Sequence, residues 1–189
     1  MRRFSYTEAM STKPNLRKFT VLAFSRTQAS LETAEPLTQF ERLEGMQQDD
    51  AAPTEVRFQV QGAMRPNSAG VAEPWLHLAA QTRLNLVCQR CLGPVEEAIS
   101  FERDFRFVAS EEQAEREDEN SEEDVLALDA DFDLLALVED ELLMALPASP
   151  KHAVCPQAVK LQVADADYVE ADEKPNPFAA LAALKTPKG

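Results

Sequence analysis

The sequence predicts an α+β fold, in which a single domain is built on an antiparallel β meander or partial barrel covered by a helix. Three segments between residues 55 and 107 alternate apolar and polar side chains with the period of two that strands require. A later segment, 131–147, changes to the helical spacing of three and four residues. A chain of 189 residues with 44% hydrophobic residues can fill one core of this kind.

The chain is predicted to form one domain flanked by tails. Residues 1–18 are basic and lack hydrophobic periodicity, which is typical of a flexible arm. Residues 19–160 contain the periodic segments and are assigned to the domain, and residues 161–189 to a C-terminal tail with a short helix. We see no secretory signal and no apolar run long enough to span a membrane, and the three cysteines fit a reducing compartment. These features predict a cytoplasmic protein.

Two short elements are expected before the meander. The apolar run 19–24, FTVLAF, predicts a short strand. In the segment 35–45, Leu37, Phe40 and Leu43 stand at helical spacing and Gly45 follows. This pattern predicts a short N-terminal helix that ends at a left-handed glycine cap.

The three alternating segments predict three long strands. Each places its apolar side chains on one face and its polar side chains on the other, as in an antiparallel sheet with one wet face. The apolar positions are Val56, Phe58 and Val60 in the first strand, Leu76, Leu78, Ala80, Leu84 and Leu86 in the second, and Val95, Ile99, Phe101, Phe105 and Phe107 in the third.

The net charge of −14 is concentrated in one segment. From Glu111 to Glu141 there are fifteen acidic residues and one basic residue, while the remaining eighteen acids balance the remaining eighteen bases. Like charges at this density repel each other, so residues 109–124 are predicted to form a disordered acidic loop. The alternative is an acidic surface that attracts a basic partner or repels nucleic acid phosphates.

Two helices are predicted after the loop at 109–124. The first begins at an aspartate cap, Asp131 or Asp133, and ends at Pro147, and its apolar positions predict that it covers the sheet. The second is a short C-terminal helix in the segment 174–185, with Asn176 as its cap and Pro177 at its first position.

The segment VCQRCLGP, 87–94, joins two predicted strands and contains Cys88 and Cys91. Three interpretations are open: half of a metal site, a redox dithiol, or a tight turn with two unreactive thiols. His152 and Cys155 could supply the other half of a tetrahedral structural zinc site. A thioredoxin-like dithiol acts at a helix N-terminus beside a parallel sheet, which disfavours the redox interpretation at this position.

Motifs of known enzyme chemistry are not found in the sequence. It has no nucleophile elbow and no phosphate-binding glycine loop, and it contains only five glycines and two histidines. We therefore predict a binding protein rather than an enzyme, with a thiol redox protein or sensor that uses Cys88 and Cys91 as the alternative.

Three blocks together resemble the bacterial YceD-like family, the large ribosomal RNA subunit accumulation proteins. They are VCQRCLGPVEEAI, FDLLALVEDELLMALPASPKHAVC and EKPNPFAALAALK, in the order that the family has them. The resemblance implies a non-enzymatic cytoplasmic factor for synthesis, processing or accumulation of large-subunit ribosomal RNA. Many relatives have further cysteine pairs where this chain has only His152 and Cys155, so the departure bears on zinc binding.

The resemblance also implies candidate partner-binding residues. The expected partners are ribosome assembly or rRNA-processing proteins, and precursor large-subunit rRNA with them, rather than membranes or DNA. Because the chain is acidic, a protein partner or a combined surface is favoured over RNA alone. The residues that match the family's helix-to-loop and C-terminal blocks are Glu139, Asp140, Glu141, Pro147, Pro150, Pro175, Asn176, Pro177 and Phe178.

Overall fold

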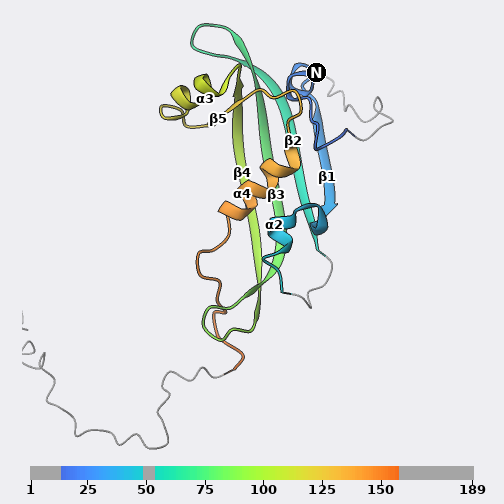
Figure 1. Ribbon diagram of the computed structural model, residues 1–189, viewed down its shortest axis with the longest axis vertical. Helices are drawn as coiled ribbons and strands as arrows, with labels where there is room; N and C mark the ends of the chain where they lie inside the picture. Colours follow the sequence, from blue (N-terminus) through green and yellow to red (C-terminus); the bar gives the residue numbers. More distant parts are fainter. Residues whose placement is uncertain (1–13, 49–53, 158–189) are drawn as a thin grey trace, which may run out of the picture. The chain divides into compact units, whose positions relative to one another are not determined.

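The computed structural model describes residues 14–48 and 54–157 (Figure 1). Its helices and strands all belong to one unit, Met1–Pro156. The predicted boundary near residue 160, the C-terminal helix and the residues Pro175, Asn176, Pro177 and Phe178 lie outside the described residues. The elements in chain order are α1 (Val21–Arg26), β1 (Ser30–Pro36), the 3-10 turn η1 (Leu37–Gln39), α2 (Glu41–Glu44), β2 (Glu55–Pro66), β3 (Ala72–Val87), β4 (Pro94–Val108), α3 (Glu111–Asp118), β5 (Asp124–Ala127) and α4 (Leu134–Met144).

A five-stranded sheet in the order β1-β2-β3-β4-β5 forms the centre of the unit. Strands β1 to β4 pair as consecutive antiparallel neighbours, and β5 joins the edge parallel to β4. The α+β class and the antiparallel meander are thereby confirmed, with β1 and β5 as additional strands. The edge strands β1 and β5 do not pair with each other in the described part of the chain, so the partial barrel is not confirmed.

One face of the sheet carries the core, and the other is largely exposed. Along β2, Val56, Phe58 and Val60 are buried while the residues between them are exposed, as the alternation predicts. Helix α4 lies over the sheet (Figure 1), and its buried apolar side chains belong to the same core. Its first turn is capped by Asp133, whose carboxylate accepts a hydrogen bond from the backbone N–H of Ala136 at 3.0 Å. The predicted covering helix is therefore confirmed.

The first elements differ from the prediction because tertiary contacts decide them. The segment expected to be a strand contains helix α1, which packs against β2 at Gly62. A Cβ atom at Gly62 would come within 2.8 Å of the backbone oxygen of Phe24, so only glycine permits this close approach. The segment expected to be one helix divides into the end of β1, η1 and α2, and Gly45 has an ordinary helical φ of −63°. The prediction of a left-handed glycine cap at Gly45 is therefore wrong.

Residues 14–18 of the predicted flexible arm are docked on the domain. Leu16 is buried in the core, and its carbonyl accepts a hydrogen bond from the N–H of Leu134 at 2.8 Å. Arg17 donates to the carbonyl of Gln39 at 2.8 Å and to the carboxylate of Asp133 at 3.2 Å. The flexible-arm prediction is wrong for these residues, because one apolar side chain and one arginine attach them to α4.

The acidic segment is ordered, so the prediction of a disordered loop at 109–124 is wrong. Ser110 caps α3 by accepting a hydrogen bond from the N–H of Gln113 at 3.3 Å. Val108 of β4, Ala114 of α3 and Val125 of β5 form a small separate apolar cluster. Local burial and capping therefore outweigh the repulsion that the charge density predicts.

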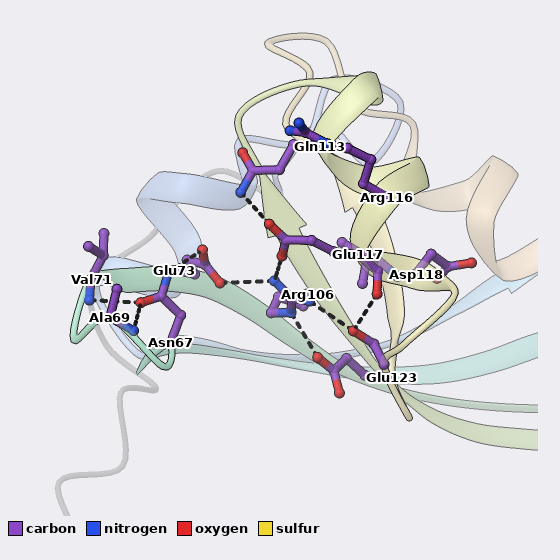
Figure 2. Close-up of polar contacts among 12 residues, drawn as sticks. Asn67, Ala69, Val71, Glu73, Arg106, Gln113, Arg116, Glu117, Asp118 and Glu123 are labelled. Atoms are coloured by element: carbon purple, nitrogen blue, oxygen red, sulfur yellow. Dashed lines mark hydrogen bonds and ion pairs between the residues drawn. The ribbon is translucent and has the colours of Figure 1, made fainter.

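Arg106 attaches this segment to the sheet (Figure 2). It lies in β4, is only 8% exposed, and donates hydrogen bonds to Glu73 at 3.2 Å, to Glu123 at 2.7 Å and to Glu117. Figure 2 shows the three carboxylates converging on one guanidinium from β3, from α3 and from the turn before β5. Burial opposes the charge of Arg106, but these hydrogen bonds outweigh burial and raise its pKa.

The β2–β3 turn is connected to the same network. Asn67 accepts hydrogen bonds from the N–H groups of Ala69 and Val71, each at 3.0 Å, and donates to Glu73 at 2.8 Å (Figure 2). The turn also contains Gly70 at a φ of +79°, which glycine adopts without strain. Glu73 is thus held between Asn67 and Arg106, and its orientation is fixed.

Candidate metal centre

The turn between β3 and β4 places the first two cysteines. The N–H of Cys88 donates to the carbonyl of Gly93, and the N–H of Leu92 donates to the carbonyl of Cys88, each at 2.9 Å. This close pairing requires a left-handed residue, and Leu92 has a φ of +60°. Cys88 is buried and Cys91 is half-buried. The prediction of a hairpin end is confirmed, since Val87 and Pro94 pair across it.

A second loop brings the other two candidate ligands to the same place. The chain leaves α4 and runs along the hairpin, where the N–H of Gln89 donates to the carbonyl of Pro150 at 2.8 Å. This contact positions His152 and Cys155 beside the turn. We call residues 87–93 and 150–156 together the cysteine tip; it lies at the end of the β3–β4 hairpin (Figure 1).

The four candidate ligands form one cluster. The ligand atoms of Cys88, Cys91, His152 and Cys155 all lie within 4.8 Å of one another, and Cys91 Sγ is 3.5 Å from His152 Nδ1. Tetrahedral zinc with three thiolates and one imidazole needs neighbouring ligand atoms roughly 3.5–3.8 Å apart. The donor set and its spacing fit a closed structural zinc site after a small contraction.

Hydrogen bonds at the cluster favour thiolate at Cys88. Burial would raise the pKa of this thiol, but the backbone N–H groups of Cys91, Arg90 and His152 point at it and lower its pKa to about 5. At Cys155, burial together with the neighbouring thiols raises the pKa. A buried sulfur that accepts several N–H groups is arranged as a metal ligand rather than as an accessible nucleophile.

The residues of the helix-to-loop block lie apart from the cluster. Glu139 is buried and accepts hydrogen bonds from the N–H groups of Arg42 and Leu43 at 2.8 and 3.2 Å, so it caps α2. Asp140 is exposed and pairs with the same Arg42. Glu141 is buried at 3.2 Å from the Nε of Arg103, and burial raises its pKa.

The two prolines of this block lie in the loop that follows α4. Pro147 is exposed and Pro150 is half-buried at the contact with the hairpin. Partner binding by these residues stays a prediction, and Asp140 and Pro147 are its exposed members. Sequence patterns gave no signal for the structural roles of Arg42 and Arg106, because their partners lie far along the chain.

Comparisons with known proteins agree with the resemblance seen in the sequence. The model of the family described as Large ribosomal RNA subunit accumulation protein YceD matches residues 76–185. A protein of Haemophilus influenzae named Large ribosomal RNA subunit accumulation protein YceD is 37% identical over 107 residues. That match covers 56% of this chain and 62% of the length of the relative.

No solved structure matches the chain. The family match includes β4, α3, β5 and α4, most of β3, and all four residues of the candidate metal centre. Because it extends over more than half of the chain, it establishes the family. The chain therefore belongs to the YceD family of large ribosomal RNA subunit accumulation proteins.

Proposed function

We propose that the protein is a ribosome-biogenesis factor that promotes the accumulation of large-subunit ribosomal RNA by binding an assembly or processing partner. The observation that carries this proposal is the family match over residues 76–185. The carboxylates of the helix-to-loop block are placed for structure, since Glu139 pairs with Arg42 at 2.9 Å and Glu141 with Arg103 at 3.2 Å.

The thiol redox alternative has weaker support. The lowered pKa of Cys88 is the observation in its favour. However, Cys88 is fully buried and follows a strand rather than beginning a helix, so an oxidised substrate has no direct access to it. The proposed function therefore gives the thiols a structural role.

Gene deletion tests the proposed function. Cells without the protein should contain less large-subunit RNA relative to small-subunit RNA, and the full-length gene should restore the ratio. The measurement is quantitative electrophoresis of total RNA from growth-matched cultures. An unchanged ratio in the deletion strain would exclude the proposed role.

As part of this proposal, the cysteine tip holds one structural zinc ion on Cys88, Cys91, His152 and Cys155. The ion would be a closed four-coordinate centre that fixes the loop after α4 to the β3–β4 hairpin. This role would add to the backbone hydrogen bond between Gln89 and Pro150, which already joins the two loops. It is also consistent with three free thiols in one cluster.

Metal analysis of the full chain should give one zinc ion per molecule. Replacing His152 with glutamine should weaken zinc binding by more than about 100-fold, because a direct ligand is lost. The matched control is His77→Gln, since the ring nitrogens of His77 lie 3.2 Å from Glu102 and 3.0 Å from Asp104 on the sheet face, away from the tip. Competition with a chromogenic chelator measures both affinities. Equal zinc affinity of the two variants would contradict the assignment.

A further inference from the structure

The side chain of Leu92 is not explained by folding. Leu92 has a φ of +60°, a conformation in which glycine or asparagine is favoured, and it is 74% exposed. In the described part of the chain, the one other non-glycine residue with positive φ is the polar Gln28. The backbone N–H of Leu92 closes the turn, but its exposed side chain contributes neither to the core nor to the hydrogen bonds of the turn. Such an outlier beside a candidate centre points to a contact with another molecule.

Two further apolar side chains are exposed next to Leu92. Val87 on the hairpin is 38% exposed, and Val154 on the second loop is 84% exposed. Half of the strongly exposed large apolar side chains in the described residues therefore lie on the cysteine tip. They come from two loops that Cys91 and His152 hold side by side. The tip thus presents a small apolar surface at the end of a hairpin.

The charge of the tip is opposite to that of the rest of the chain. Residues 87–95 and 142–157 contain no aspartate or glutamate, although the protein has 33 acidic residues. Arg90 and Lys151 are exposed on the tip, and neither takes part in an ion pair within the described residues. The neighbouring Arg83, by contrast, pairs with Glu96 at 2.8 Å. Two cations thus remain available to an anionic partner.

We infer that the cysteine tip contacts an unpaired segment of RNA, with Arg90 and Lys151 at its phosphates and Leu92 and Val154 against its unstacked bases. The inference rests on the proposed function and names the surface that would meet the ribosomal RNA. A protein interface needs about 20–30 residues on each side, far more than the tip offers. Unpaired RNA needs only a few apolar contacts between cations that follow its backbone.

The test measures binding of the full zinc-loaded chain to a labelled transcript of precursor large-subunit RNA at several salt concentrations. Arg90→Gln combined with Lys151→Gln should weaken binding about tenfold and reduce the slope of log affinity against log salt by about 1.4. The control combines Arg57→Gln with Arg83→Gln. It removes the same charge from the open sheet face, where both arginines are ion-paired. This control should leave the affinity nearly unchanged.

Leu92→Asn separates binding from folding. Asparagine tolerates a positive φ, so this variant should keep its zinc and its melting temperature. Its affinity for the transcript should fall about five- to tenfold with an unchanged salt slope. The matched control is Val71→Asn, because Val71 is 60% exposed in the other hairpin turn. Equal binding by the Leu92 and Val71 variants would overturn the inference.

A photoreactive amino acid at the exposed position of Gln89 identifies the partner class in cells. Adducts that ribonuclease shortens support the inference. Adducts that resist ribonuclease and contain a protein overturn it in favour of an acidic protein partner. If deletion reduces large-subunit RNA but the wild-type chain does not bind the transcript, the inference fails and the proposed function stands. If the RNA ratio is unchanged but binding depends on the tip, the proposed function fails instead.

Discussion

Replacement of Arg106 with methionine is expected to lower the free energy of unfolding by about 3–5 kcal/mol. The change leaves Glu73, Glu117 and Glu123 close together without their shared cation. Glu73 is 8% exposed, so its charge cannot be hydrated well without moving α3. Urea unfolding of the purified chain, followed by circular dichroism, measures the loss.

The matched control for Arg106 is Arg83→Met. Arg83 lies on the neighbouring strand β3 and pairs with Glu96 at 2.8 Å, but its side chain is 71% exposed. An exposed pair contributes at most about 1 kcal/mol, so this variant should unfold near the wild-type midpoint. Similar losses in the two variants would show that burial of the network has no energetic effect.

Acid should weaken the same network. The hydrogen bond from Arg106 lowers the pKa of Glu117 below its ordinary value of 4.5. A carboxylate with a lowered pKa in the folded state stabilises the fold above pH 4.5, and this contribution is lost as the pH falls through the folded pKa. The Arg106→Met variant should therefore lose less stability than the wild type between pH 5 and pH 3. Urea unfolding of both proteins at several pH values in this range measures the difference.

Replacement of Glu139 with glutamine is expected to cost about 2–4 kcal/mol. Its carboxylate accepts four hydrogen bonds: two from the backbone N–H groups of Arg42 and Leu43, and two from the guanidinium of Arg42 at 3.0 and 2.9 Å. An amide of the same size can accept through only one oxygen and turns its NH₂ group toward donors. The start of α2 should therefore separate from α4.

Asp140→Asn provides a close control, since Asp140 is the next residue and pairs with the same Arg42. The side chain of Asp140 is 51% exposed, against 11% for Glu139, so its loss should cost less than about 1 kcal/mol. Thermal unfolding of both variants gives the comparison. A larger loss for Asp140→Asn than for Glu139→Gln would contradict the capping role.

Sequence patterns predicted those parts of the fold that depend on neighbours in the chain. Alternation identified β2, β3 and β4, because one face of these strands is buried along most of their length; only the end of β4, residues 105–108, is buried on both faces. Helical spacing and the aspartate cap identified α4. By contrast, the segment of α1 was predicted as a strand, because a short, mostly apolar run does not reveal that Gly62 provides a site for Phe24.

The charge of the acidic segment also failed to predict its structure, because its ion-pair partners are distant in the sequence. Its density of carboxylates predicted disorder, yet two of them, Glu117 and Glu123, join Glu73 of β3 around Arg106 and stabilise a folded arrangement. Glu73 precedes Arg106 by 33 residues, so no local pattern links them. The candidate metal residues were found from spacing alone. Their convergence depends on the contact between Gln89 and Pro150, which spacing does not contain.

The two halves of the candidate metal centre lie far apart in the sequence, so the first half is translated well before the second. Cys91 and His152 are separated by 61 positions, and β4, α3, β5 and α4 all lie between them. In an unfolded chain, closing a loop of this length costs roughly 3.6 kcal/mol of entropy. In the folded domain, the packing of the β3–β4 hairpin and α4 has already closed this loop, so metal binding no longer carries the entropy cost. A metal ion would therefore bind completed molecules far more tightly than nascent ones, and its uptake would mark the end of folding.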